Sequence, residues 1–167
     1  MISPVTGRKI ILDKDGKPCR ACNTLLDFQM ATGKLKTVEE TSKQPSVQNT
    51  APQSSAYDKE DPPDVEKLGS STWTLLHLIA ATYPEEPTTK EQAEMKLFVS
   101  LFGKFYPCWF CAKDFRAYIK KYEPDTSSQD SFGRWLCNAH NEVNVKMGKE
   151  KFNCDIWKKR WKDGWDE

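Results

Sequence analysis

Cys108 and Cys111 are the residues whose type and spacing most directly predict chemistry in this chain. Two thiols at positions i and i+3 of a first helical turn can close a disulfide, and the free N–H groups and positive dipole end of a helix stabilise a thiolate. This pattern is typical of a redox-active Cys-x-x-Cys. On its own it also fits half of a zinc site or an inert structural bridge, so other residues must decide among the three.

The residues around this pair predict the helix that positions it. Pro107 suits a helix start. Beyond Cys108, sulfur, aromatic and aliphatic side chains recur at the spacing of one helical face: Cys111, Phe115, Tyr118, Ile119 and Tyr122. Glu123 and Pro124 end the pattern, because a proline disfavours helix in the residue before it. We therefore expect the cysteine pair on the first turn of a helix.

All six cysteines fall into plausible pairs, since Cys19 with Cys22 and Cys137 with Cys154 join the pair already named. Even numbers of cysteines at paired spacings suit an oxidising compartment. Residues 1–12 show neither the apolar core of a secretory signal nor the arginine-rich, acid-poor composition of a transit peptide. Together these observations favour the mitochondrial intermembrane space, reached by another import route.

Composition divides the chain into three expected parts. Residues 1–33 can form little core, so we expect the Cys19–Cys22 pair there to be exposed, as a mobile redox pair or an arm of a metal site. Residues 34–60 are rich in Ser, Thr, Gln, Pro and Lys, which predicts a disordered tether with a span on the order of 30 Å. Residues 61–167 hold the folded domain.

Helical periodicity predicts that this domain is all-α. The first helix follows Asp61-Pro-Pro-Asp64 and ends near Tyr83, with an apolar face of Val65, Leu68, Trp73, Leu76, Ile79 and Ala80. Thr88 and Glu91 form a capping-box pattern before the second helix. We expect the buried stripe of that helix to comprise Leu97, Phe98, Leu101, Phe102 and Phe105.

A further helix follows the cysteine helix and ends at Gly148. Its expected core side comprises Phe132, Trp135, Leu136, Ala139, Val143 and Met147. Past Cys154, a short segment presents Trp157 and Trp161 one helical turn apart. No stretch predicts a strand or an internal repeat.

Several function classes are disfavoured by the sequence. The 25 basic and 24 acidic residues are well mixed, which gives no basic surface for nucleic acid. The longest apolar run, about Leu75–Ala81, is too short to span a bilayer. Zinc ribbons space their cysteine pairs by about 15–20 residues, whereas 85 residues separate Cys22 from Cys108. A thioredoxin-like protein would need a βαβ pattern, which this chain lacks.

A helical bundle with a thiol pair and many Trp, His and Asn side chains suits a flat aromatic cofactor such as a flavin. Flavin chemistry would also supply the sink for two electrons that continuous disulfide formation requires. The main rival is a zinc-binding interaction module whose cysteines are ligands. Visible absorbance measured against zinc content separates the two.

Four motifs in the order and spacing of one family carry a resemblance: Trp73-Thr-Leu-Leu-His77, Tyr106-Pro-Cys-Trp-Phe-Cys-Ala-Lys-Asp-Phe115, Trp135-Leu-Cys-Asn-Ala-His-Asn-Glu-Val-Asn144 and Arg160-Trp-Lys-Asp-Gly-Trp165. Residues 61–167 resemble the FAD-linked sulfhydryl oxidases of the Erv/ALR family. Cys19-Arg-Ala-Cys22 is similar to the shuttle pair of the mitochondrial members.

The resemblance implies a four-helix bundle with a short fifth helix, preceded by a flexible N-terminal arm, that binds FAD and forms a homodimer. Matching this sequence to the family motifs residue by residue implies a set of cofactor-binding residues: Gly69, Trp73, His77, Lys104, His140, Asn141, Asn144, Lys149, Arg160 and Trp161. Cys111 is then the thiol beside the flavin, Cys108 is the interchange thiol, and Cys137–Cys154 is a structural bridge.

The implied activity is a thiol oxidase that converts two thiols and O2 to a disulfide and hydrogen peroxide. Electrons pass from a protein dithiol through Cys19–Cys22 and Cys108–Cys111 to FAD, and then to oxygen or cytochrome c. The implied substrate is the disulfide-carrier import receptor of the intermembrane space. Two features depart from the family pattern: Ser70 stands where many members carry Arg, and the pair Trp109-Phe110 is bulkier and less polar than is common between the active cysteines.

Overall fold

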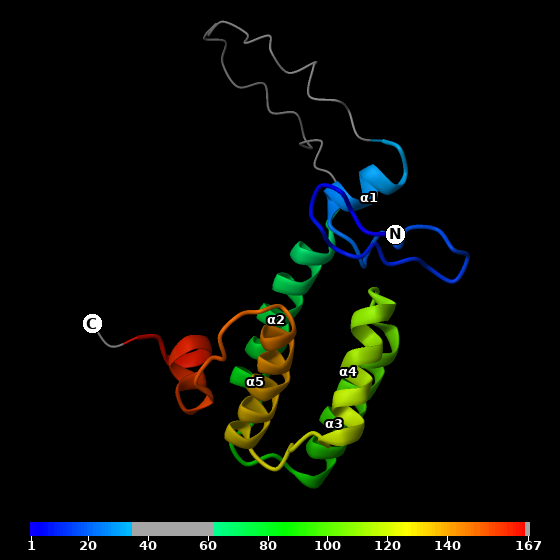
Figure 1. The fold of residues 1–167 in the computed structure, drawn as a ribbon. Helices are drawn as coiled ribbons and strands as arrows, with labels where there is room; N and C mark the ends of the chain where they lie inside the picture. The colour runs from blue at the N-terminus through cyan, green and yellow to red at the C-terminus, as the bar shows by residue number, and fades with distance from the viewer. Residues whose placement is uncertain (35–61, 166–167) are drawn as a thin grey trace, which may run out of the picture. The chain divides into compact units, whose positions relative to one another are not determined.

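The computed structural model describes residues 1–34 and 62–165. The tether expected at residues 34–60 lies outside the described residues, except for Lys34 at its start. The chain divides into two compact units, Met1–Val65 and Glu66–Glu167, which are described separately. Figure 1 colours both units along the chain.

The N-terminal unit contains one short helix, α1 (Leu25–Ala31), and two isolated antiparallel bridges, Ile2 with Lys9 and Leu12 with Pro18. Among the described residues of this segment Ile10 is the one buried aliphatic side chain, which agrees with the expectation of little apolar core, but the polar residues Ser3, Asn23 and Asp27 are also buried. Half of the buried residues are polar, so a count of apolar residues could not reveal this interior.

Two buried side chains hold this polar interior together. The Asn23 carboxamide accepts a hydrogen bond from the Ile11 N–H at 2.9 Å and donates to the Ile11 and Cys19 carbonyls at 2.8 and 2.6 Å. The Asp27 carboxylate accepts from the Thr6 hydroxyl at 2.6 Å and from the Thr24 hydroxyl at 2.8 Å. The buried Asn23 and Asp27 side chains are therefore both satisfied by partners. The Arg20 Nη1 is the exception in this unit, since it is buried and has no partner among the described residues.

Residues 62–65 belong to the same unit. The Val65 N–H donates to the Asn23 carbonyl, and the Leu25 N–H donates to the Asp64 carboxylate, both at 3.2 Å. The Arg20 guanidinium donates to the Pro62 carbonyl. Segments some forty residues apart in the sequence therefore meet through backbone and side-chain hydrogen bonds.

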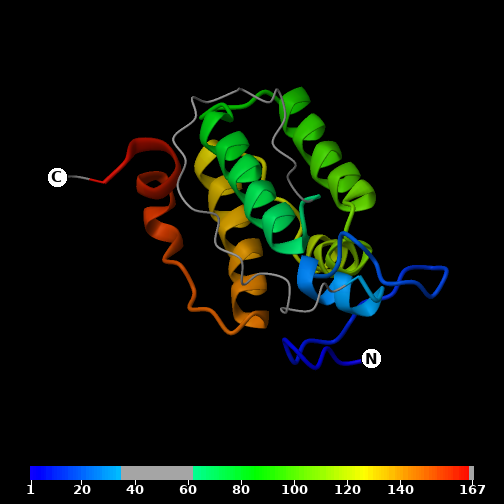
Figure 2. The ribbon, with the colours of Figure 1, turned by 90° about the horizontal axis from the view of Figure 1, so that it is seen from above.

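The second unit is helical throughout and confirms the expected bundle with a short final helix. Its elements are α2 (Val65–Thr82), α3 (Thr89–Phe105), α4 (Trp109–Lys121), α5 (Gln129–Lys146), the 3₁₀ turn η2 (Cys154–Ile156) and the π-helical turn η3 (Lys159–Asp163). Helix α2 packs beside α5, and α3 packs beside α4, as Figures 1 and 2 both show. None of the helices in the described residues is long and apolar enough to cross a membrane.

The helix ends follow local capping chemistry. Thr88 and Glu91 form the predicted capping box at the start of α3. Ser128 caps α5 through a hydrogen bond that its hydroxyl accepts from the Ser131 N–H at 3.0 Å. Gly148 follows the end of α5 with φ of 71°, a left-handed conformation that favours glycine.

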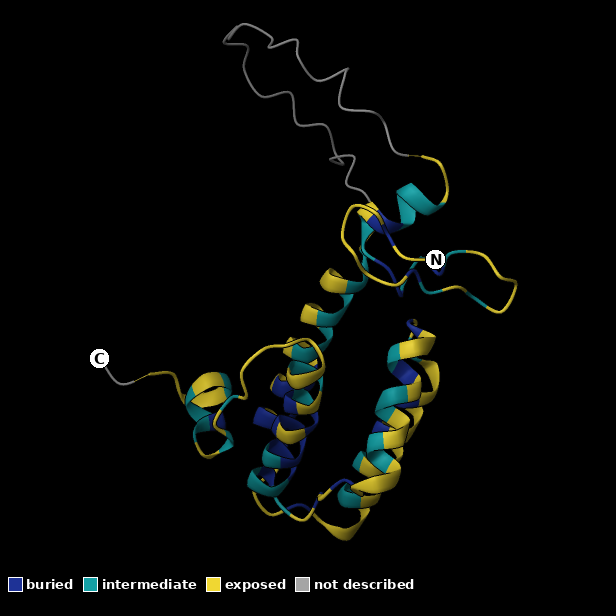
Figure 3. Ribbon diagram, in the orientation of Figure 1, coloured by how far each residue is buried: buried dark blue, intermediate teal, exposed yellow. Residues whose placement is uncertain are grey.

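The core lies between α2 and α5, where Figure 3 shows most of the buried residues. Leu76 and Ala80 of α2 pack with Phe132 and Leu136 of α5, and Trp157 completes the cluster. The expected core side of α5 is confirmed except at its C-terminal end, where Met147 is 54% exposed.

The predicted buried stripe of α3 was wrong in four of its five members. Leu97 and Phe105 are 58% and 71% exposed, and Phe98 and Leu101 are also exposed. Helix α3 instead packs through Met95, Val99, Phe102 and Gly103. The helix carries apolar residues on two faces, and periodicity alone cannot tell which face meets the core.

Candidate redox and cofactor site

The cysteine pair on α4 has the geometry that the sequence predicts. Cys108 is the N-cap of α4, and its Sγ accepts a hydrogen bond from the Cys111 N–H at 3.2 Å. A disulfide joins the two residues. The first turn of α4 contains no acidic residue, so the positive helix end is not neutralised and favours a thiolate when the pair is reduced.

The residues between these cysteines face outward. Trp109 and Phe110 are both exposed, and their rings meet edge to face with centroids 5.9 Å apart. Their bulk therefore lies at the surface beside the redox pair, where it can limit which thiols approach.

The other two cysteine pairs are also disulfides. Cys137 on α5 bonds to Cys154 at the start of η2, and Cys19 bonds to Cys22. The expected exposure of Cys19 and Cys22 was wrong, because each is only 8% exposed. The hydrogen bond from Asn23 to the Cys19 carbonyl fixes this turn within the N-terminal unit.

Four aromatic side chains from three elements form two stacked pairs in the second unit. Trp73 of α2 stacks on His140 of α5 with centroids 4.2 Å apart and planes within 4°. His77 of α2 stacks on Trp161 of η3 at 4.4 Å and 7°. The structure thus brings together four of the residues predicted at the cofactor.

The two histidines of this cluster bond to each other. The His77 Nε2 lies 3.0 Å from the His140 Nδ1, so one nitrogen donates and the other accepts. Burial lowers the pKa of His77 to about 3, and electrostatic repulsion from His140 and Arg160 acts in the same direction. Burial likewise lowers the pKa of His140 to about 4, helped by the charge of Lys149. Both rings are therefore neutral at physiological pH.

One atom of the cluster lacks a protein partner. The His77 Nδ1 is buried and has no hydrogen-bond partner among the residues that the structure describes. A buried polar atom without a partner is costly, which indicates that a ligand supplies one. Flat ring faces around an unsatisfied nitrogen fit a planar ligand with a polar edge.

Two cations border the cluster. The Arg160 guanidinium carbon lies 4.3 Å from the centre of the Trp161 ring. Lys149 is exposed and close enough to depress the pKa of His140. Positive charge beside stacking surfaces is the arrangement that suits a dinucleotide, whose pyrophosphate is anionic.

The remaining predicted cofactor residues differ in their surroundings. Asn141 uses its side chain on the backbone of Phe152, donating to the carbonyl and accepting from the N–H, both at 2.8 Å. Asn144 donates to the Asn141 Oδ1 at 3.4 Å. Asn141 therefore holds the segment that follows α5, and its carboxamide is occupied.

Gly69 and Lys104 stay predictions. A Cβ built on Gly69 would meet no described atom within 4 Å, so no neighbouring part of the described chain requires glycine there. The Lys104 ammonium lies 5.2 Å from the centre of the Phe105 ring. Neither observation connects these residues with the aromatic cluster.

A cavity of about 320 Å³ lies between α4 and α5. Its lining includes Tyr118, Trp135, Asn141, Glu142 and Lys151. Of the residues predicted at the cofactor, only Asn141 lines it. The cavity is therefore distinct from the space around the stacked rings.

The sequence model of the Erv1/Alr family matches residues 70–162. The chain is 52% identical to the mitochondrial FAD-linked sulfhydryl oxidase ERV1 of Saccharomyces cerevisiae, over 98% of this chain and 92% of that protein. It belongs to the Erv1/Alr family. The mitochondrial FAD-linked sulfhydryl oxidase erv1 of Schizosaccharomyces pombe is 41% identical, over 90% of each chain.

Solved structures of Erv1/Alr proteins agree with this assignment. The crystal structure of the yeast Erv1 core has a TM-score of 0.66 and 54% identity, covering 71% of this chain and all of that one. The FAD-binding domain of Erv1 from Saccharomyces cerevisiae has a TM-score of 0.61 and 54% identity, covering 63% of this chain and all of that one.

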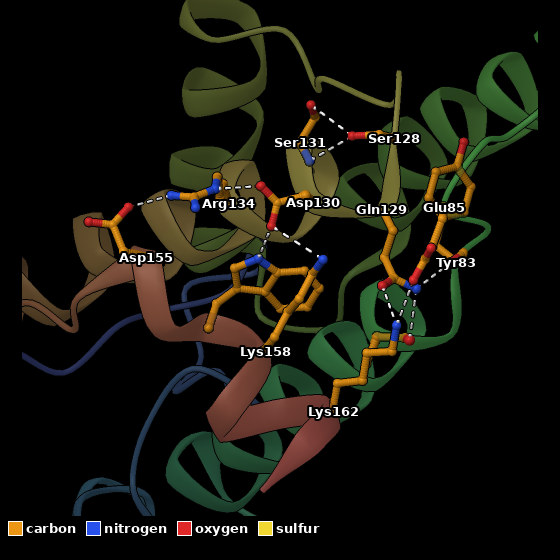
Figure 4. A network of polar contacts seen from close by, with 12 residues as sticks. Tyr83, Glu85, Ser128, Gln129, Asp130, Ser131, Arg134, Asp155, Lys158 and Lys162 are labelled. Atoms are coloured by element: carbon orange, nitrogen blue, oxygen red, sulfur yellow. Dashed lines mark hydrogen bonds and ion pairs between the residues drawn. The ribbon is translucent and has the colours of Figure 1, made fainter. Parts of the chain in front are cut away.

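Sequence reasoning missed the polar residues that hold the segment after α5 in place. Asp130 is their centre, and it binds Trp157, Arg134 and Lys158 (Figure 4). A charged residue on the first turn of a helix is usually explained by the helix dipole, so no sequence signal singled it out.

Proposed function

We propose that this chain is an FAD-linked sulfhydryl oxidase that makes disulfides in protein substrates. The observation that carries the proposal is the presence of a helix-capping disulfide, Cys108–Cys111, in the same helical unit as the stacked Trp73/His140 and His77/Trp161 pairs. The names of the yeast relatives support the same activity and cofactor.

The residues that would hold FAD are those of the aromatic cluster. Their ring faces would stack on its planar groups, the unpaired His77 Nδ1 would bond a polar edge, and Lys149 and Arg160 would neutralise the pyrophosphate. The chemistry supplied by bound FAD is acceptance of two electrons from Cys108–Cys111 and their transfer to oxygen or cytochrome c.

The protein's own steps are two thiol–disulfide exchanges. A substrate thiolate attacks a sulfur of the Cys19–Cys22 disulfide, which breaks that S–S bond and forms a mixed disulfide. The second substrate thiolate resolves it, so the substrate gains a disulfide and Cys19–Cys22 gains two electrons and two protons. The same exchange then passes the electrons to Cys108–Cys111.

In this scheme the three disulfides have different roles. We assign Cys108 as the interchange thiol, Cys111 as the thiol beside the flavin, and Cys137–Cys154 as a structural bridge between α5 and η2. Cys19 and Cys22 are buried, so the N-terminal unit must open locally to expose at least one of the two sulfurs to the attacking thiolate before each exchange.

The finer setting follows from the same features. The relatives' names support a mitochondrial location. The disulfides favour its oxidising intermembrane space, with the disulfide-carrier import receptor as the protein dithiol. Exposed apolar side chains of α2 and α3, which include Leu75, Leu78, Leu97, Leu101 and Phe105, suit burial in a homodimer.

Absorbance of the purified protein tests this function. We expect a yellow protein that carries about one FAD per chain and oxidises dithiothreitol with release of hydrogen peroxide. A colourless, folded protein with stoichiometric zinc would instead support the zinc-binding interaction module. Measuring flavin, zinc and thiol content on one preparation separates the two functions.

A further inference from the structure

The segment from Phe152 to Asp163, here called the C-terminal strap, is held along one face of α5. Its contacts on α5 recur at nearly four-residue intervals: Gln129 and Asp130, Gly133 and Arg134, Cys137, and Asn141. Positions at this spacing share one face of a helix. The strap therefore follows a continuous stripe of α5, and Figure 4 shows the polar part of that stripe.

Asp130 is the centre of the contacts in the middle of the strap. Its Oδ1 accepts a hydrogen bond from the Trp157 indole N–H at 3.0 Å and lies 3.7 Å from the Lys158 ammonium. Its Oδ2 accepts from the Arg134 Nε at 2.7 Å, and Arg134 in turn pairs with Asp155 at 2.5 Å. One carboxylate thus connects α5 with three residues of the strap, directly or through Arg134.

Gly133 sets how closely the strap approaches α5. A Cβ at this position would lie 2.2 Å from the nearest ring atom of Trp157, which is less than a non-bonded contact allows. Trp157 is fully buried. Its indole is therefore fixed in two ways, by contact with the bare backbone of Gly133 and by the hydrogen bond to Asp130.

The far end of the strap has a second anchor. The Lys162 ammonium donates to the Gln129 Oε1 at 2.7 Å and to the Glu85 carboxylate at 3.2 Å. The Gln129 Nε2 donates to the Ala81 and Tyr83 carbonyls at 3.1 and 2.6 Å. Gln129 therefore ties the end of the strap to the end of α2, as Figure 4 shows.

Trp161 lies between these two anchors, one turn beyond Trp157 and one residue before Lys162. Its ring is the one that stacks on His77. The Cys137–Cys154 disulfide restrains only the start of the strap, because Trp161 follows Cys154 by seven residues. The covalent bridge therefore cannot by itself orient the Trp161 ring.

We propose that Asp130 and Gly133 are positioning residues for the cofactor, which act by fixing Trp157 so that Trp161 is held against His77 in the orientation that binds FAD. The proposal rests on the proposed function. Asp130 and Gly133 do not touch the cofactor in this account. They restrict the conformations of the strap before FAD binds, so the strap loses less conformational entropy in the binding step.

The test measures FAD affinity of the apoprotein by quenching of flavin fluorescence. Asp130→Ala should weaken FAD binding about tenfold, which is the scale of one aromatic contact. Asp130→Asn keeps an oxygen that can accept from the Trp157 indole, so it should restore most of the affinity. Glu123→Ala, which removes an exposed ion pair with Lys96 away from the strap, is the matched control and should bind FAD normally.

A double-mutant cycle separates positioning from general destabilisation. In a Trp161→Ala background, Asp130→Ala should cause little further loss of affinity, because both changes remove the same contact. Equal losses with and without Trp161 would overturn the proposal, as would normal FAD affinity in Asp130→Ala. Gly133→Ala should behave like Asp130→Ala in the same cycle.

These outcomes are distinct from failure of the proposed function. If the unaltered protein does not bind FAD, the function itself is wrong. If it binds FAD but the affinity is independent of Trp161, the cofactor is held elsewhere and the positioning role is excluded. Melting of each apoprotein shows whether a variant is folded before its affinity is compared.

Discussion

The His77 Nε2 and the His140 Nδ1 lie 3.0 Å apart and share one hydrogen bond across the interface of α2 and α5. Only one of the two nitrogens can carry the proton in this bond. Protonation of both rings would therefore break it and place two positive charges side by side in a buried stack. The pair cannot hold this geometry when both rings are charged, and burial favours the state in which both are neutral.

This relationship predicts acid sensitivity of the fold and of cofactor binding. The pKa values of about 3 for His77 and about 4 for His140 lie below the ordinary value of 6.5, so the unfolded chain binds more protons at intermediate pH. The contribution of the pair to stability is complete above pH 6.5 and is lost as pH falls toward 3. His77→Asn should flatten this part of the plot of unfolding free energy against pH. If the slope of unfolding free energy against pH is the same in His77→Asn, the two histidines are not neutral in the folded protein.

The two thiols on α4 should have different spectroscopic effects. Cys111→Ser should abolish reduction of the flavin by dithiols. Cys108→Ser should leave a Cys111 thiolate beside the flavin and allow a long-wavelength charge-transfer band, because the helix end stabilises that thiolate. Absorbance spectra of both variants provide the measurement. Finding the band in the Cys111 variant instead would exchange the two roles.

The Cys137–Cys154 bridge should contribute to stability rather than to turnover. It closes a loop of roughly 18 residues, for which the chain-entropy model gives about 3 kcal/mol. Replacing both cysteines by serine should lower the melting temperature while the folded, flavin-bound fraction keeps its activity. Calorimetry and a dithiothreitol assay on the same sample test both statements. Lost activity in a fully folded, flavin-bound variant would disprove the structural role.

The Cys19–Cys22 pair should matter for protein substrates and not for small ones. Replacing both residues by serine should greatly slow oxidation of the import receptor, because its thiols then lack the relay. Oxidation of dithiothreitol should continue, since Cys108–Cys111 is unchanged. The ratio of the two rates is the measurement. Equal losses for both substrates would mean that the N-terminal unit supports the active site itself, whereas undiminished oxidation of the protein substrate would mean that the pair carries no electrons.

Much of the fold follows from local sequence signals. The capping box of Thr88 and Glu91 lies where it was predicted, and Cys108 caps the predicted helix of the redox pair. The stacking residues Trp73 and His77 are four positions apart, so the sequence could place them on one face of α2. These signals work because they depend on residues within one or two helical turns.

Features that depend on distant residues could not be predicted in the same way. Asp130 bonds to Trp157, and no pattern in the sequence connects two residues 27 positions apart. The exposed apolar stripe of α3 has a spacing as regular as that of the buried face, so periodicity alone predicts the wrong side for the core. The buried interior of the N-terminal unit could not be predicted because Asn23 and Asp27 form much of it, and polar residues in a sequence do not indicate burial.

Each unit contains a structural asparagine, Asn23 or Asn141, whose deamidation would disturb the local fold. Asn23 bonds to the N–H and C=O of Ile11, and Asn141 bonds to those of Phe152, so each carboxamide acts as a backbone segment would. Asparagine is a thermolabile residue, and its deamidation leaves a carboxylate of nearly the same shape. The oxygen that replaces the amide nitrogen would lie at hydrogen-bond distance from a carbonyl oxygen, and neither atom would have a proton to donate. A single hydrolysis would then loosen the turn of one disulfide or the start of the strap, without changing any cysteine.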